Sequence, residues 1–225
     1  MASLRSRLSL FMTAFLAATA LARPTLERRA VIPALDPFYD PPAGFASEEP
    51  GTILRNRPVA SSFLGLVPNP VEAYQLLYRT TAIDGSAIAE VTTVFVPSNA
   101  KTDRFVSFQT AYDSANTICN PSYNYQLGAV QTDLITAIEM LILEIYLAEG
   151  YIVSSSDYEG PDAAFSAGRL SGTGVLDNMR AVSNFEKLGL VDNPAIGKLK
   201  QTERKENKKK KKRRLRRIMF SDVFI

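Results

Sequence analysis

Two neighbouring stretches of the chain carry the two-residue hydrophobic period of a β-strand. Residues 74–79 (YQLLYR) place a large apolar side chain at every second position, and residues 87–96 (AIAEVTTVFV) are rich in β-branched residues. Asp84-Gly85, between them, is a turn signal. We therefore predict a β-hairpin over these two stretches.

The segment from residue 132 to residue 150 carries a helical period instead. Gly150 is the expected stop, and Thr132 or Asp133 is available as the N-cap. Apolar residues recur at helical spacing at five positions: Leu134, Ile138, Leu141, Ile142 and Ile145. Because so much of this helix is apolar, we expect it to be deeply buried in a complete domain. In a half-built sheet we expect it to lack part of that burial, with apolar faces left uncovered and aggregation as the consequence.

The rest of the pattern alternates strands with helices. Residues 104–112 and 151–156 are expected strands, and residues 171–188 are an expected helix that ends at Gly189. Its buried face is predicted to contain Val175, Met179, Val182 and Phe185. This order predicts an α/β fold whose parallel sheet begins with an antiparallel edge. A further parallel strand should follow, but residues 193–196 run directly into lysines.

Before the hairpin, the sequence is typical of targeting and connecting segments. A basic start and an apolar run that closes on small residues predict a signal peptide over residues 1–22, with an uncleaved signal anchor as the alternative. Arg28-Arg29 fits either a processing site that ends a short pro-segment, residues 23–29, or a solvated charge pair. Residues 31–70 are rich in proline, so we expect them to wrap over the surface as extended loop.

Charge is distributed unevenly along the chain. Residues 1–197 contain 13 Lys and Arg against 20 Asp and Glu, whereas residues 198–217 contain 13 basic residues against two glutamates. The net charge of +3 is therefore a property of the C-terminal tail, and the body, residues 30–197, is expected to form one acidic domain.

Two residue counts limit the chemistry. No histidine occurs in the 225 residues, which excludes a Ser-His or Cys-His mechanism within this chain. Cys119 is the single cysteine, and in an oxidising compartment it could form an intermolecular bridge, stay a buried free thiol, or lack its partner. We expect no cofactor and no metal.

Candidate nucleophiles are few. No Gly-x-Ser-x-Gly elbow occurs, and Ser171, in GRLSGTG, has the wrong glycine spacing, so we interpret this stretch as a flexible loop before a helix. Ser98 and Lys101 match the Ser-x-x-Lys spacing of lysine-activated serine enzymes, but they follow a strand rather than opening a helix. A chance match is the favoured interpretation.

Three carboxylates follow the expected strand at residues 151–156. Asp157, Glu159 and Asp162 lie where ligands and catalytic groups gather in parallel sheets. A metal site or a carboxylate pair is one interpretation. Loop capping and turn formation is the favoured one.

Five ordered stretches resemble a known family. They are residues 36–39 (DPFY), 74–81 (YQLLYRTT), 93–97 (TVFVP), 107–123 (SFQTAYDSANTICNPSY) and 148–181 (AEGYIVSSSDYEGPDAAFSAGRLSGTGVLDNMRA). Together they resemble the fungal secretory lipases, α/β-hydrolases of the Candida antarctica lipase A type. The resemblance runs from residue 35 to residue 196, the N-terminal part of that family's catalytic domain. It implies an incomplete α/β-hydrolase fold that ends before the nucleophile elbow.

The resemblance also implies a function and two residue roles. The family is one of secreted, extracellular triacylglycerol lipases, which act on acylglycerols or other lipid esters through a serine, an aspartate and a histidine further along the chain. Asp113 matches the residue whose backbone N–H contributes to the oxyanion hole. Cys119 matches a cysteine that pairs with a downstream one. Because the nucleophile, acid and base are all missing, we expect this chain to be catalytically inactive.

The basic tail, residues 198–225, has no counterpart in the resemblance. We expect it to be disordered, and its KENKKKKKRRLRR run resembles a nuclear-localisation or nucleic-acid patch, although such runs bind polyanions without specificity. Gly197-Lys198-Leu199 can be encoded as GGT-AAG-TTG, which contains the form of a fungal 5′ splice donor. We therefore hypothesise that the tail is translated intron, and genomic DNA without a donor at Gly197 would refute this.

The leading hypothesis is thus a truncated secreted lipase without a transmembrane segment and without a specific nucleic-acid partner. The alternative is a non-catalytic secreted protein whose polybasic tail binds anionic surfaces or nucleic acid. Salt-sensitive binding to heparin or anionic vesicles, lost on deletion after Gly197, would favour the alternative.

Overall fold

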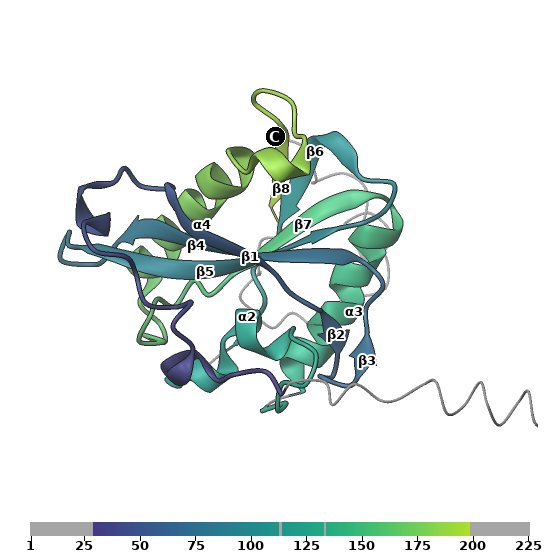
Figure 1. Ribbon diagram of the computed structural model, residues 1–225, viewed down its shortest axis with the longest axis horizontal. Helices are drawn as coiled ribbons and strands as arrows, with labels where there is room; N and C mark the ends of the chain where they lie inside the picture. Colours follow the sequence, from purple (N-terminus) through teal and green to yellow (C-terminus); the bar gives the residue numbers. More distant parts are fainter. Residues whose placement is uncertain (1–28, 113, 133, 199–225) are drawn as a thin grey trace, which may run out of the picture.

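A mixed β-sheet forms the centre of the molecule (Figure 1). The computed structural model describes residues 29–112, 114–132 and 134–198. Within them the sheet has six strands in the order β1-β4-β5-β7-β6-β8. Their bounds are β1 (Ile53–Pro58), β4 (Glu72–Thr81), β5 (Ala87–Val96), β6 (Lys101–Ser107), β7 (Tyr151–Ser156) and β8 (Ala195–Lys198). Strand β6 pairs in parallel with both β7 and β8, and the other pairs are antiparallel.

The predicted hairpin is confirmed. Strands β4 and β5 pair over ten positions, from Glu72 opposite Val96 to Thr81 opposite Ala87. The turn between them contains Gly85 at a φ of 90°, a left-handed conformation that glycine adopts without steric cost. Together with β1, which pairs with β4, this hairpin forms the antiparallel edge of the sheet, and the parallel strands β6, β7 and β8 follow it in the chain, as the pattern predicts.

Helices cover both faces of the sheet. Helix α4 (Gly168–Ser183) packs Met179 and Val182 against one face, whereas α3 (Ile135–Ala148) packs Met140 and Leu143 against the other. Consecutive strand residues such as Phe105 and Val106 belong to these two different cores, because side chains alternate across a strand. Shorter helical segments complete the structure: η1 (Pro33–Leu35), η2 (Phe45–Ser47), η3 (Thr117–Cys119), α2 (Pro121–Asn124) and η4 (Glu186–Leu188).

Helix α3 is buried on one side only, so the predicted deep burial is wrong for the five positions named, whereas the expected loss of part of its burial is confirmed. The side chains expected inside are exposed: Leu134 at 67%, Ile138 at 53%, Leu141 at 55%, Ile142 at 39% and Ile145 at 57%. The helix faces the sheet with Ala137, Met140, Leu143 and Leu147 instead. Because both faces of this helix are apolar, the hydrophobic period alone does not show which face packs against the sheet. Helix α3 begins at Ile135 after Leu134, so Thr132 is not its N-cap, and Asp133 lies outside the described residues.

Three further expectations need correction. The proline-rich segment 31–70 is not all loop, because β1 pairs with β4 within it and β2 (Ser62–Phe63) pairs with β3 (Val67–Pro68). The GRLSGTG stretch is the first half of α4 rather than a flexible loop. Residues 195–198 do form the further parallel strand, β8, which pairs with β6 as far as Lys198.

The predicted buried face of α4 is confirmed, with Val175 only partly buried.

A buried carboxyl group lies under α4. Glu90 of β5 is 2% exposed, and its Oε2 accepts a hydrogen bond of 2.8 Å from the hydroxyl of Tyr78 on β4. Gly174 of α4 leaves the space for this group, since a Cβ there would overlap the Glu90 carboxyl oxygens. Nearby, Thr80 donates to Asp177 of α4 over 2.7 Å. Burial raises the pKa of Glu90 to about 8, and the charges of Asp157 and Asp177 add to the effect.

Candidate functional site at the carboxyl ends of β6 and β7

The parallel strands β6 and β7 end side by side. Ser107 of β6 lies opposite Ser154 of β7, so the loops that follow the two strands leave the same edge of the sheet. This edge is where ligand-binding and catalytic groups collect in parallel sheets. Phe108 at the start of the first loop donates its N–H to the carbonyl of Ser154 over 2.8 Å, which continues the pairing into the loop.

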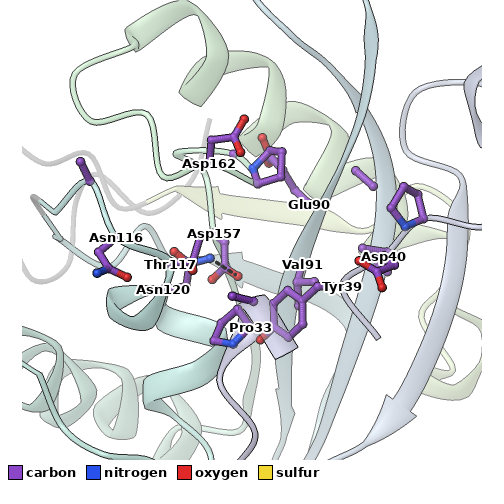
Figure 2. A pocket seen from close by; sticks show the side chains of 17 residues that line it. Pro33, Tyr39, Asp40, Glu90, Val91, Asn116, Thr117, Asn120, Asp157 and Asp162 are labelled. Atoms are coloured by element: carbon purple, nitrogen blue, oxygen red, sulfur yellow. Dashed lines mark hydrogen bonds between the residues drawn. The ribbon is translucent and has the colours of Figure 1, made fainter. Parts of the chain in front are cut away.

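Asp157, the first residue after β7, is the centre of the site. It is 2% exposed, and its carboxylate accepts hydrogen bonds from the backbone N–H of Ser122 at 2.8 Å and from the Ser122 hydroxyl at 2.5 Å. Asn120 donates to it from its side-chain amide over 3.3 Å, the dashed line in Figure 2. Burial raises the pKa of Asp157 to about 7, and the bonds from Ser122 and Asn120 oppose this rise. The carboxyl thus anchors α2, 35 residues away in the sequence, to the end of β7.

The N-terminal segment is tied into the same network. The hydroxyl of Tyr39 lies 2.7 Å from that of Ser122, and burial raises the Tyr39 pKa far above its ordinary value. The side chain of Gln75 donates to the Ser122 carbonyl over 2.6 Å. Arg57 in turn donates to Gln75 Oε1 over 2.7 Å and to Asp36 over 2.7 Å. The DPFY stretch is therefore joined to Asp157 through a continuous chain of hydrogen bonds.

The loop after β6 is held to the loop after β7 by two tyrosines. Tyr158 donates its hydroxyl to the carbonyl of Thr110 over 2.9 Å, and the N–H of Glu159 donates to the hydroxyl of Tyr112 over 3.0 Å. The two tyrosine rings meet edge to face with centroids 5.1 Å apart. Asp113, the candidate oxyanion donor, follows Tyr112 directly but lies outside the described residues. The segment that leads to it is thus fixed by hydrogen bonds up to residue 112.

A cavity of about 500 Å³ opens beside Asp157 (Figure 2). Its walls come from η1 and the segment after it, from β5, and from the loops after β6 and β7. Four acidic residues and no Lys or Arg line it: Asp40, Glu90, Asp157 and Asp162. The lining thus offers no cationic side chain to pair with an anionic ligand.

The carboxylates singled out in the sequence are only partly brought together. Asp157 and Asp162 line the cavity and Glu159 does not, although Glu159 is itself buried. No cluster of three His, Cys, Asp or Glu side chains that could hold a metal ion occurs in the part of the chain that the structure describes. Loop capping, the favoured interpretation, does not describe Asp157, whose side chain binds α2 rather than its own loop.

The other candidates lie apart from this site. Ser98 follows β5 and Lys101 begins β6, so both lie at the sheet edge away from the carboxyl ends of β6 and β7, and both are exposed. The Lys101 ammonium lies 4.1 Å from the centroid of the Tyr151 ring. Ser171 lies within the first half of α4, where its hydroxyl faces the Ala167 carbonyl at 3.4 Å. Cys119 is a partly exposed free thiol in η3.

Sequence analysis did not identify Ser122 or Tyr39, which complete the site. The Asn-Pro-Ser order at residues 120–122 was a usable signal, because proline at the first helical position leaves the next backbone N–H free to bind a carboxylate. The identity of that carboxylate could not be deduced from spacing along the chain.

Comparisons with known proteins agree with this geometry. A family model described as secretory lipase matches residues 125–198. A probable inactive lipase of Mycobacterium tuberculosis is 43% identical over 172 residues, which cover 75% of this chain and 39% of the relative. A secreted triacylglycerol lipase of Malassezia furfur is 42% identical over 160 residues, which cover 70% of this chain and 34% of the relative.

Among solved structures, Candida antarctica lipase A in its closed state matches with a TM-score of 0.67 and 32% identity, over 75% of this chain and 39% of that protein. The mixed sheet with helices on both faces therefore defines an α/β-hydrolase-like fold. The chain is thus similar to the N-terminal part of members of the secretory lipase family. It spans about two fifths of the length of the relatives that it matches.

Proposed function

We propose that this chain is the oxyanion-side part of a secreted carboxylic-ester hydrolase whose substrates are acylglycerols or other lipid esters. The observation that carries the proposal is the shared fold, in which the loops after β6 and β7 are joined at one sheet edge by Asp157, Tyr158 and Glu159. Relatives named secreted triacylglycerol lipases support the substrate class and the extracellular location. No helix in the described ranges has both the length and the apolar character of a membrane span.

Within this proposal, Asp113 contributes its backbone N–H to the oxyanion hole. A donor of this kind stabilises the negative charge that develops on the carbonyl oxygen when a nucleophile attacks an ester. The neighbouring Tyr112 supports the assignment, because its hydroxyl is bonded to Glu159 on the adjacent loop and so limits the freedom of the backbone that leads to residue 113.

The 225 residues are not expected to hydrolyse esters by themselves. They contain no histidine to act as the general base for a serine and no Gly-x-Ser-x-Gly elbow to present one. One relative is itself named a probable inactive lipase. Without a nucleophile, an oxyanion donor has no charge to stabilise.

The experiment is a hydrolysis assay on the purified chain. With p-nitrophenyl butyrate at pH 7, we expect release of p-nitrophenol at the rate of buffer alone, while Candida antarctica lipase A at equal concentration serves as the positive control. Turnover that co-purifies with the chain through two different columns would overturn the proposed inactivity.

The assignments at the two termini are proposals of the same kind. Signal-peptide removal after residue 22, and processing after Arg29, are tested by N-terminal sequencing of the protein secreted from a fungal host. The translated-intron hypothesis for the tail is tested by cDNA sequencing across the codons for residues 195–200. A spliced transcript that continues into a serine elbow supports it, and a transcript that retains the lysine codons contradicts it.

A further inference from the structure

One peptide unit in the loop after β6 is hydrogen-bonded on both of its sides. Its carbonyl, that of Thr110, accepts a bond of 2.9 Å from the hydroxyl of Tyr158 in the loop after β7. Its N–H, that of Ala111, donates over 2.6 Å to the Oε2 atom of Glu139 on α3. We call these two bonds the peptide clamp. Because a peptide unit is planar, its carbonyl and its N–H turn together, and a rotation of the unit breaks both bonds.

The two side chains of the peptide clamp come from elements that are themselves fixed. Tyr158 follows Asp157, whose carboxylate is bonded to α2, and its ring packs edge to face on that of Tyr112. Glu139 lies in α3, where the next residue, Met140, is 2% exposed and packs in the core under the sheet. The clamp therefore joins the loop after β6 to two elements with fixed positions.

The two bonds also support each other electrostatically. A hydrogen bond from an N–H to a carboxylate is charge-assisted and about twice as strong as one between neutral groups, which favours the bond to Glu139. Burial raises the pKa of the Tyr158 hydroxyl, and the charges of Glu159 and Glu139 add to this rise. Tyr158 therefore keeps the proton that it donates to the Thr110 carbonyl.

The peptide clamp lies just before the candidate oxyanion donor. Only Tyr112 separates the clamped unit from residue 113, and the bond that the Tyr112 hydroxyl accepts from Glu159 holds a side chain rather than the backbone. An oxyanion donor is effective when its N–H already points at the position where charge develops, and supporting contacts hold such groups to within about 0.5 Å. A clamp on the backbone itself meets this requirement.

We propose that Glu139 and Tyr158 are positioning residues for the oxyanion side of the site. They fix the orientation of the Thr110–Ala111 peptide and thereby the direction in which the backbone enters residue 113. The proposal rests on the proposed function, in which Asp113 is the donor. Both residues act through the backbone of the loop and not on the ester itself.

The test is amide hydrogen exchange of the full chain, followed residue by residue by NMR. Glu139→Leu removes the acceptor of the peptide clamp, whereas Glu139→Gln keeps an acceptor oxygen. Tyr158→Phe removes the donor of the clamp and keeps the ring that packs on Tyr112. The matched control is Glu144→Leu, because Glu144 is a partly buried glutamate of the same helix that is hydrogen-bonded to Asn69.

We expect Glu139→Leu to speed exchange at least about tenfold at residues 111, 112 and 113, and Glu139→Gln and Glu144→Leu to stay within about threefold of wild type. Tyr158 does not accept the Ala111 N–H, yet we expect Tyr158→Phe to speed exchange at Ala111 at least about fivefold, because the peptide unit turns as a whole. The double variant Glu139→Leu/Tyr158→Phe should show less than the product of the two single effects, since either loss alone opens the clamp.

Four results would overturn the proposal. Faster exchange at Ala111 alone, with residues 112 and 113 unchanged, would show that the peptide clamp does not fix the backbone that follows it. Unchanged exchange at Ala111 in Tyr158→Phe would show that the two bonds are independent. A Glu139→Gln variant as fast as Glu139→Leu would show that the acceptor oxygen is not what holds the loop. Equal acceleration in β5 and α4 would assign Glu139 to global stability.

Two features keep this test decisive. Should Glu139→Leu fail to fold, Tyr158→Phe, which loses only one hydroxyl, gives the answer by itself. Amide exchange requires no ester and no nucleophile, so failure of the peptide clamp is distinct from failure of the proposed function, which the hydrolysis assay tests.

Discussion

The buried carboxyl group of Glu90 makes the stability of the fold depend on pH. In the folded chain its pKa is raised from 4.5 to about 8 by burial, while in the unfolded chain it is that of an ordinary glutamate. A raised folded pKa means that the stabilisation is complete below pH 4.5 and is lost as pH rises towards 8. Between pH 5 and pH 8 Glu90 is ionised in the unfolded chain but largely protonated in the folded chain. Over about three pH units this difference lowers the free energy of unfolding by about 4 kcal/mol.

The variant Glu90→Gln isolates this effect. Glutamine has the same shape and keeps an acceptor for the Tyr78 hydroxyl, but it cannot ionise. In urea unfolding followed by circular dichroism, we expect wild type to lose at least about 2 kcal/mol of unfolding free energy between pH 5 and pH 8, and Glu90→Gln to lose distinctly less. The exposed residue Glu48 gives the control, Glu48→Gln, which should behave as wild type.

Equal pH dependence in wild type and Glu90→Gln would show that Glu90 does not cause the loss of stability. A Glu90→Gln variant less stable than wild type at pH 8 would show the same. Asp157, whose pKa is also raised by burial, adds a pH dependence in the same direction, which is why the difference between the two proteins is the quantity to measure.

Two further substitutions test the packing around the buried carboxyls. Gly174→Ala places a methyl group against the Glu90 carboxyl, so we expect it to lower the free energy of unfolding by more than about 2 kcal/mol. The control, Gly172→Ala in the same helix, meets no atom within 4 Å and should be neutral or stabilising by up to about 1 kcal/mol. Equal effects of the two substitutions in urea unfolding would contradict the contact. Ser122→Ala removes the hydroxyl between Tyr39 and Asp157. We expect the free energy of unfolding to fall by about 1–2 kcal/mol and amide hydrogen exchange in residues 120–124 to become faster. Unchanged exchange there would show that the network does not hold α2.

The sequence was informative where local pattern and tertiary contact agree. The β4–β5 hairpin follows from the alternation and the Asp84-Gly85 turn, and the buried face of α4 follows from a single apolar stripe. For α3 the same method selected the wrong face, because residues such as Met140 and Leu143 repeat at the same period as Leu141 and Ile145. Periodicity identifies a helix but cannot rank two apolar faces.

The candidate site shows a second limit. The loop after β7 could be identified from the strand that precedes it, yet the partners of Asp157 could not. Ser122 and Tyr39 are 35 and 118 positions away from it in the sequence, and only the assembled sheet brings them together. The role of Asp113 rests on the resemblance to the secretory lipases and stays a prediction.

We propose that this chain combines the fold of a secretory lipase with the absence of an activated nucleophile. Treating the purified chain with a fluorophosphonate probe, which labels serines made nucleophilic by a catalytic base, tests it directly. We expect no labelling under conditions that label Candida antarctica lipase A to completion. A stoichiometric adduct, mapped by peptide sequencing to one serine of these 225 residues, would contradict it.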